Sequence, residues 1–390
     1  MTAKRKLIND EKGMILFSSL LLVSVLMAAG MGTWIAIQND YKITSNLRQA
    51  TAVFYFADAG IEWAKQQISQ TTVHPPTLAD RVQSFSYGTF SVVYLSSTRV
   101  TPLMAKIIIR STGASGISSQ TTQAQITKAY DLADAAIGLR GGEANVSLSG
   151  NSFFVSGFDF DPANNMLIAG AQPRSAISTS SAVLRAQIEA ALTTQQSGNV
   201  IGGENNNAIS RSGLIPGAII TQLGDELCRA PHVVTTAIPV GETLVLAGET
   251  WGSRSMPQLH CIEGLPGIDD SVTVGGNFSG VGILVVRNAE IIANGAFRWE
   301  GLIVVTGTGV GLRVVGEESK EVYGAVMINE TNSVAATIPT ILAIQGAIKV
   351  FYSRSALDRI TGLMPSQTLE SLYASLPATI RQDYWRSVNP

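Results

Sequence analysis

The chain has 390 residues, of which 45% are hydrophobic and only 14% are charged, and its formal net charge is −2. This composition is too apolar for a disordered chain, and the balanced charge gives no reason to expect nucleic acid as a partner. Two cysteines and three scattered histidines provide neither a disulfide scaffold nor a CxxC or HExxH metal motif. The 37 glycines without a G-X-Y period indicate many tight turns between short strands.

A long uncharged segment follows a short basic leader. No charged side chain occurs from Gly13 to Gln38, and residues 14–37 are largely apolar. As a helix this segment would measure about 36 Å, which is enough to cross a bilayer core. It is too long for the apolar core of a cleaved secretory signal. A plain membrane anchor and a pilin-type helix fit this length better, and in both the basic leader would stay in the cytoplasm.

The apolar pattern continues beyond the uncharged segment as one face of a helix. Apolar residues recur at steps of three and four, at Ile43, Leu47, Ala50, Phe54, Ala57, Ile61, Ala64 and Ile68. This spacing predicts an amphipathic helix that continues the membrane segment without a break. The rod would have about 55 residues and a length of roughly 80 Å, with its second half packed against a globular head.

Two sequence stretches resemble the N-terminal region of PilX-type type IV pilus assembly proteins. They are "KGMILFSSLLLVSVLMAAGMG" and "NLRQATAVFYFADAGIEWAKQQI". The matching positions are Asn46, Arg48, Phe54, Ala57, Asp58, Ala59, Gly60, Ile61 and Glu62. The resemblance implies cleavage by prepilin peptidase after Gly13, which leaves Met14 as the mature N-terminus. It also implies that the partners are other pilins and the inner-membrane pilus assembly machinery.

Ser18 departs from the pattern of major pilins at the fifth mature position. Major pilins carry a glutamate there, which can neutralise the free amine of a neighbouring subunit in an apolar bundle. A subunit without this acid avoids burying a charge, but it cannot complete the pair. The resemblance of this position to that of acid-lacking minor pilins and pseudopilins therefore implies a tip or initiator position in the filament.

Residues 71–135 are predicted to form a pilin-like β meander. Three β-branched segments with partial alternation are separated by turn residues, at Tyr87–Leu95, Leu103–Gly113 and Ser119–Tyr130. Antiparallel strands of this kind would cover the apolar face of the helix.

Residues 136–352 are predicted to form a right-handed parallel β-helix, with parts at about 140–160 and 270–352. Apolar strands follow Gly282, Gly301, Gly324 and Gly346 at a period near 20 residues, which is typical of stacked solenoid turns. An irregular β-sandwich is the alternative. A helical and loop insertion is expected at about 175–232, where Ser181 would cap a helix, and residues 353–390 are expected to form a helical cap.

No catalytic residue is predicted. Charged residues occur among the apolar strands at Arg287, Glu290, Arg298, Glu300 and Arg313. A solvated face explains them better than the paired acids of a polysaccharide-active enzyme. Neither a GxSxG motif nor a P-loop is present. No cofactor is expected.

Two residue pairs have local chemistry of their own. Asp159 and Asp161 lie in "DFDPANN", which resembles a calcium loop only weakly because it lacks the distal glutamate. A capped turn is the simpler explanation, and no metal is assigned. Cys228 and Cys261 form either one extracytoplasmic disulfide or two separately buried thiols.

The sequence therefore predicts an α+β protein in five parts. These are a leader (1–13), a transmembrane and stalk helix (14–70), a β meander (71–135), a β-helix-like region (136–352) and a cap (353–390). The function expected from the resemblance is that of a minor pilin in pilus assembly or adhesion, held in the bacterial inner membrane and then in an extracellular pilus. The alternative is a bitopic envelope protein with a structural or carbohydrate-binding ectodomain, and a β-helix polysaccharide enzyme comes third.

Overall fold

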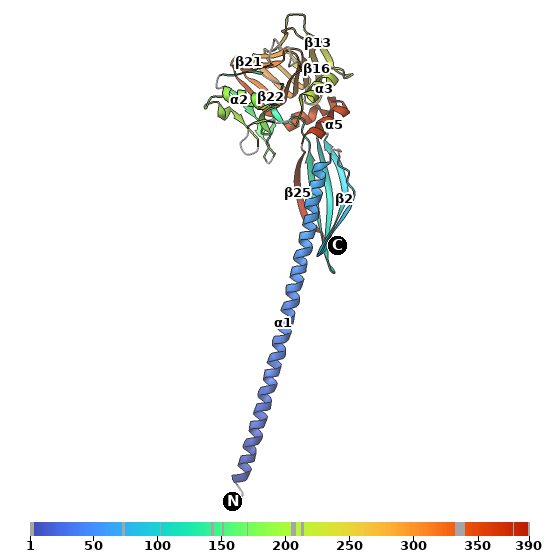
Figure 1. The fold of residues 1–390 in the computed structure, drawn as a ribbon, viewed down its shortest axis with the longest axis vertical. Coiled ribbons are helices and arrows are strands. Elements are labelled where there is room, and N and C mark those ends of the chain that lie inside the picture. Colours follow the sequence, from blue (N-terminus) through green and yellow to red (C-terminus); the bar gives the residue numbers. More distant parts are fainter. Residues whose placement is uncertain are drawn as a thin grey trace.

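The computed structural model describes residues 4–71, 75–101, 103–141, 144–149, 152–169, 171–203, 208–211, 214–331, 340–376 and 378–388. A single long helix leads into two β regions (Figure 1). The smaller region lies beside the end of the helix, and the larger one, here called the body, lies beyond it.

Helix α1 (Lys4–Gln70) runs from the leader through the apolar segment into the amphipathic segment without a break. Its second half packs against the smaller sheet through Val53, Ala57, Ile61, Ala64 and Ile68, all of them buried. The predicted apolar face was wrong at its start, because Ile43 and Leu47 are 57% and 62% exposed. The sheet reaches down the helix only to Gln49, which accepts a hydrogen bond from Ser118.

The smaller sheet is antiparallel and has the strand order β1-β2-β3-β4-β25. Its strands are β1 (Arg81–Phe85), β2 (Gly88–Thr101), β3 (Met104–Ser115), β4 (Ser118–Ala129) and β25 (Thr379–Val388). The predicted helical cap at 353–390 was wrong in its last part, because β25 returns from the body and pairs with β4. Helices α4 (Arg354–Ile360) and α5 (Ser366–Ser375) occupy the first part.

The body is built from two sheets whose strands pair only in parallel, as the near-continuous apolar strands predict. The larger sheet contains β5 (Ala135–Arg140), β7 (Phe153–Ser156), β10 (Ser175–Thr179), β11 (Val200–Ile201), β12 (Ile209–Arg211), β13 (Val234–Ala237), β15 (Thr250–Trp251), β16 (Gln258–Glu263), β18 (Phe278–Arg287), β20 (Phe297–Gly307), β22 (Lys320–Glu330) and β24 (Ile348–Tyr352). The smaller contains β6 (Ala144–Leu148), β14 (Thr243–Ala247), β17 (Ser271–Gly275), β19 (Glu290–Asn294), β21 (Gly311–Val315) and β23 (Thr340–Ile344). A separate hairpin is formed by β8 (Phe160–Asp161) and β9 (Met166–Leu167).

From β16 to β24 the chain alternates between these two sheets, so that one strand from each forms a rung of a stack. Equivalent residues of the smaller sheet face one another in register, in the series Leu244, Val272, Ile291, Leu312 and Leu342. Four of these five side chains are buried in the main hydrophobic core, and Leu244 packs against it. The core of the body is thus built from columns of apolar side chains, in which each residue packs on the equivalent residue of the next strand.

Three of the four strand-leading glycines form a column across the larger sheet. Gly282, Gly301 and Gly324 pair in register and have φ values of 150°, 135° and 137°. A Cβ atom at each would meet the carbonyl of the neighbouring strand. A strand, β24, follows Gly346 as predicted, but Gly346 lies outside this column, because Gly324 pairs with Tyr352 and Gly346 lies against Gly316.

The order of rungs in space differs from the order in the chain. Strands β5 and β6 pair with β22 and β23 in the stack, although they are the first two strands of the body in the sequence. The predicted insertion at 175–232 was wrong in part, because β10, β11 and β12 belong to the larger sheet. Helix α2 (Ala182–Ala191), capped by Ser181 as predicted, packs on β6, and α3 (Gly217–Cys228) packs across β20, β22 and β18. Short 3₁₀ segments lie at Ser197–Asn199 and Thr361–Leu363.

Candidate functional site

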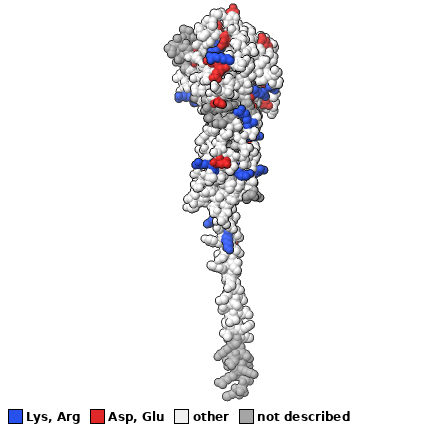
Figure 2. Space-filling model, turned by 90° about the vertical axis from the view of Figure 1, so that its right-hand side faces the viewer, with Lys and Arg blue, Asp and Glu red and all other residues white. Residues whose placement is uncertain are grey.

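The first half of α1 is an exposed apolar surface. It lies within the one helix of the described residues, Met14–Gln70, that is long and apolar enough to span a membrane. Between Met14 and Ile37 its large apolar side chains are 51–71% exposed, and Figure 2 shows this part of the shaft without charged groups. So large an apolar surface indicates lipid or protein as its natural surroundings.

The hydroxyl groups in this surface are satisfied within the helix. Ser18 donates a hydrogen bond from Oγ to the carbonyl of Ile15 at 3.0 Å, and Ser24 donates to Leu21 at 2.8 Å. Because these bonds are internal, the surface can enter an apolar environment without leaving a hydroxyl donor unpaired. Gly13 and Met14 lie within the continuous α1, and cleavage between them stays a prediction.

The residues of the family-like motif separate into two groups. Ala57 and Gly60 face the sheet, and a Cβ atom on Gly60 would collide with Ser111 Oγ of β3. Ile61 is also buried and Asp58 is half-buried, while the remaining motif residues lie toward solvent, at Asn46, Arg48, Phe54, Ala59 and Glu62. Phe54 meets Trp385 of β25 edge-on with a ring distance of 5.5 Å, and Glu62 pairs with Lys65 at 2.6 Å. The motif thus provides both the packing face of the stalk and part of its exposed face.

Lys128 closes the C-terminal end of α1, a role that no sequence pattern indicates. Its fully buried side chain extends from β4 and donates hydrogen bonds to the carbonyls of Ile68 (2.6 Å) and Thr71. These are among the carbonyls that a helix end leaves without partners. Burial lowers the pKa of Lys128 to about 8.

A buried ionic cluster joins the smaller sheet to the body. Asp131 follows β4 and is fully buried, and its Oδ1 accepts hydrogen bonds from Arg354 Nη2 (2.8 Å) and the Tyr352 hydroxyl (2.6 Å). Its Oδ2 pairs with Arg174. Burial and the Asp131 carboxylate raise the pKa of Tyr352 well above its ordinary value, so the hydroxyl keeps its proton and donates.

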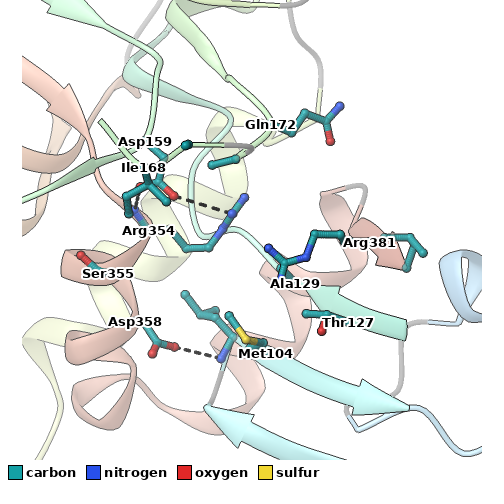
Figure 3. A pocket seen from close by; sticks show the side chains of 14 residues that line it. Met104, Thr127, Ala129, Asp159, Ile168, Gln172, Arg354, Ser355, Asp358 and Arg381 are labelled. Carbon is teal, nitrogen blue, oxygen red and sulfur yellow. Dashed lines mark hydrogen bonds and ion pairs between the residues drawn. The ribbon is translucent and has the colours of Figure 1, made fainter. Parts of the chain in front are cut away.

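A cavity of about 450 Å³ lies beside this cluster, between the smaller sheet and α4 (Figure 3). Its lining is mostly apolar, with Met104 and Ile380 on the sheet side. The charged groups around it are engaged with protein partners: Asp358 accepts from the Leu103 amide, Asp159 pairs with Arg354, and Arg381 pairs with Asp383. The cavity therefore marks a joint between the two β regions, and each of these charged groups has a protein partner.

The weak calcium candidates serve local structure. Asp159 Oδ1 accepts the amide of Arg354 at the start of α4, and Asp161 Oδ1 accepts the amide of Ala163 in a tight turn. Burial raises the pKa of Asp159. The one described group of three possible metal ligands is elsewhere, at Cys228, Cys261 and Glu263. The two sulfur atoms of that group are bonded to each other, which removes them as metal ligands.

Cys228 and Cys261 form a disulfide with a Cα–Cα distance of 5.3 Å. Cys228 is the last residue of α3, and Cys261 lies fully buried in β16. The bond therefore fixes the end of α3 to β16, the strand next to β13 at one end of the larger sheet.

The solvated face predicted for the charges among the apolar strands is wrong for the two glutamates, while Arg287, Arg298 and Arg313 are partly exposed. Glu290 and Glu300 are both buried, and Glu290 pairs with Arg313 at 2.9 Å. Glu300 accepts from Arg254 and Arg298. Burial alone would raise the pKa of Glu300, but these hydrogen bonds outweigh it and lower the pKa.

Comparison with known proteins leaves the family open. No protein-family model and no curated protein matches the sequence. Among solved structures, the chain is similar to the crystal structure of the competence-associated pilin ComZ from Thermus thermophilus. The identity is 12% and the TM-score is 0.22, over 87% of this chain and 98% of that one. We therefore take the function from the geometry of the chain itself.

Proposed function

We propose that the protein is a minor type IV pilin-like subunit that uses α1 first as an inner-membrane anchor and then as its filament segment. One observation carries the proposal: α1 is unbroken, exposes an uncharged apolar surface in its first half and packs on its own sheet in its second. A plain anchor needs the first property only. The second makes the helix and the smaller sheet one rigid unit, as insertion into a bundle of similar helices requires.

The body would be carried outside as a right-handed β-helix. Two parallel sheets with alternating strands support a coil, and right-handed crossovers are the strong preference for parallel strands. The disulfide fits an oxidising compartment. In this proposal the body assists pilus assembly or binds a surface or carbohydrate ligand. The N-terminal leader of the chain lies in the cytoplasm before processing.

The proposed action is non-covalent. Glycoside hydrolysis needs a carboxylic acid whose pKa is raised enough to donate a proton. Glu300 has a lowered pKa, and Glu290 is engaged by Arg313. Polysaccharide turnover that is lost in Glu290→Ala and Glu300→Ala would contradict this part of the proposal.

N-terminal sequencing of protein purified from its native membranes tests the main proposal. We expect the mature chain to begin at Met14, and Gly13→Leu to retain the leader. Gly30→Leu is the matched control, since Gly30 also lies in α1 and no atom lies within 4 Å of an added Cβ atom there. This variant should be processed normally. A start at Met1 in the unaltered protein would support the bitopic envelope protein instead.

The tip position is tested at Ser18. An end subunit without an acid cannot pair with the amine of a neighbour, whereas Ser18→Glu restores that pairing. We expect Ser18→Glu to move the protein from pilus ends into the shaft, as seen by immunogold labelling, and to change pilus number. Unchanged location and number would argue against a special end role.

A further inference from the structure

The stack of rungs has two unlike ends. At one end α2 packs on β6, and Gln196 donates a hydrogen bond to the Leu148 carbonyl. At the other end lie β13 and β14, each the outermost strand of its sheet. Within the described residues no strand pairs with the outer edge of either. Figure 1 places β13 at the margin of the body farthest from the start of α1.

The end strand β14 is a complete strand with one unused edge. All five of its residues pair in register with β17, from Thr243 with Ser271 to Ala247 with Gly275. Leu246 is buried in the core, whereas Val245 is 62% exposed. An outermost strand presents backbone N–H and C=O groups at the spacing of another strand. This chemistry recognises an extended polypeptide.

The charge of this end selects among such polypeptides. The charged residues nearest to β14 in the chain are Glu242 and Glu249. The next ones are the arginines Arg229 and Arg254, and Arg254 is paired with Glu300. Both glutamates are exposed and flank β14. A second copy paired at the same edge would place these like charges near one another, which is unfavourable. A segment with basic residues at its ends would be attracted.

We propose that the open edge of β14 binds an extended, basic-flanked segment of a different polypeptide as an added strand. The bound segment would extend the smaller sheet of the body by one strand, with Val245 contributing apolar contact. The proposal does not depend on processing at Gly13, so it can fail while the pilin proposal holds, or the reverse.

The test uses the full-length protein in detergent and a fluorescein-labelled peptide of sequence Lys-Lys-Thr-Val-Thr-Val-Thr-Lys-Lys. We expect saturable binding by fluorescence anisotropy, weakened at high salt, and hydrogen-exchange protection of the amides of residues 243–247. Replacing the lysines of the peptide with glutamate should weaken binding at least tenfold. Proline at its central position should also abolish binding, because proline cannot donate a strand hydrogen bond.

Matched variants locate the binding site. Val245→Lys should weaken binding of the basic peptide at least tenfold, while Val183→Lys on α2, where the valine is 58% exposed, should leave it unchanged. Glu242→Lys with Glu249→Lys should reverse the preference toward the acidic peptide. Equal binding by Val245→Lys and the unaltered protein would overturn the proposal, as would protection at other strands. Concentration-dependent dimers that protect residues 243–247 would also overturn it, because a second copy would then be the partner.

Discussion

Two glycines set the distance between α1 and the smaller sheet. A Cβ atom on Gly60 would meet Ser111 Oγ of β3, and one on Gly113 would meet the backbone of α1 at Val53. Glycine in a helix interior costs about 1 kcal/mol relative to alanine. At Gly60 the close approach that glycine permits explains why the sequence accepts this cost.

Gly60→Ala should therefore destabilise the stalk, although alanine is the better helix former. We expect a loss of about 1–3 kcal/mol, as for other overpacked sites. Denaturation of the full chain in detergent measures it, with Trp63 beside Phe90 as the fluorescent probe. Ser111→Gly should restore part of the loss. The control Gly30→Ala has no atom within 4 Å of the new methyl group, and a similar loss there would contradict the packing explanation.

His260 is a second residue whose surroundings determine its behaviour. Its ring stacks on Trp251 at 3.9 Å, its Nε2 contacts Gln258 Oε1 at 3.1 Å, and its buried Nδ1 has no hydrogen-bond partner among the described residues. Burial lowers the pKa of His260, with a smaller opposing effect from Glu249. The folded protein therefore favours the neutral ring.

Stability should fall as the pH drops through the ordinary histidine pKa of about 6.5. Below that pH the unfolded chain binds a proton that folded His260 resists, so the free energy of unfolding decreases with decreasing pH. Above it, the contribution is fully present. Urea denaturation at about pH 7 and about pH 5 measures the difference, and His260→Phe should reduce it. His232→Phe, at an exposed position, should not, and equal acid sensitivity in all three proteins would contradict the assignment.

At the scale of elements, local pattern predicted α1, the three meander strands and the glycine-led strands. Each depends on a period that the residues themselves carry. The exposed stretch around Ile43 and Leu47 could not be recognised, because its apolar period is the same as that of the buried stretch. The exposed and buried stretches of α1 differ only in whether the smaller sheet extends far enough along the helix to cover them. The strand β25 was missed for a similar reason, since its partner β4 lies some 250 residues earlier in the chain.

The disulfide joins two elements, and its loss should weaken both. Cys228 and Cys261 are 33 residues apart, and closing a loop of that length stabilises by about 3–4 kcal/mol in the chain-entropy treatment. Cys228→Ser with Cys261→Ser should lower the free energy of unfolding by about that amount and increase hydrogen exchange in α3 and β16. Dithiothreitol should destabilise the unaltered protein equally and leave the double variant unchanged. Unaltered exchange in α3 would show that packing alone holds the helix.

At the scale of the whole molecule, the body is inserted between two neighbouring strands of the smaller sheet. The chain leaves that sheet after Ala129 and returns at Thr379, and these two residues face each other across β4 and β25. Sequence order predicted the β regions one after the other, because each segment has its own composition. The nesting depends on contacts between distant segments, which composition does not record. The cluster of Asp131, Tyr352 and Arg354 was not predicted for the same reason, because Asp131 lies more than 200 residues before the other two in the chain.

This nesting predicts that the smaller sheet can fold without the body. Replacing residues 131–377 with a short turn of about four residues that contains Asn-Gly would connect β4 directly to β25 as a hairpin. The core of that unit, formed by Ile61, Ile107 and Ile126 among others, draws on α1 and the smaller sheet alone. We expect the shortened chain in detergent to unfold cooperatively and to protect the β25 amides from hydrogen exchange.

A second chain that ends at residue 130 is the matched control for this experiment. It lacks β25 and therefore also the bonds that Gln125 and Thr127 donate to Asp383. Its exposed β4 edge should exchange rapidly and aggregate, because an unpaired edge is a template for other strands. If the shortened chain with the turn were unfolded while the intact protein is stable, the body would be required for the stalk to fold, and the two regions would form one cooperative unit.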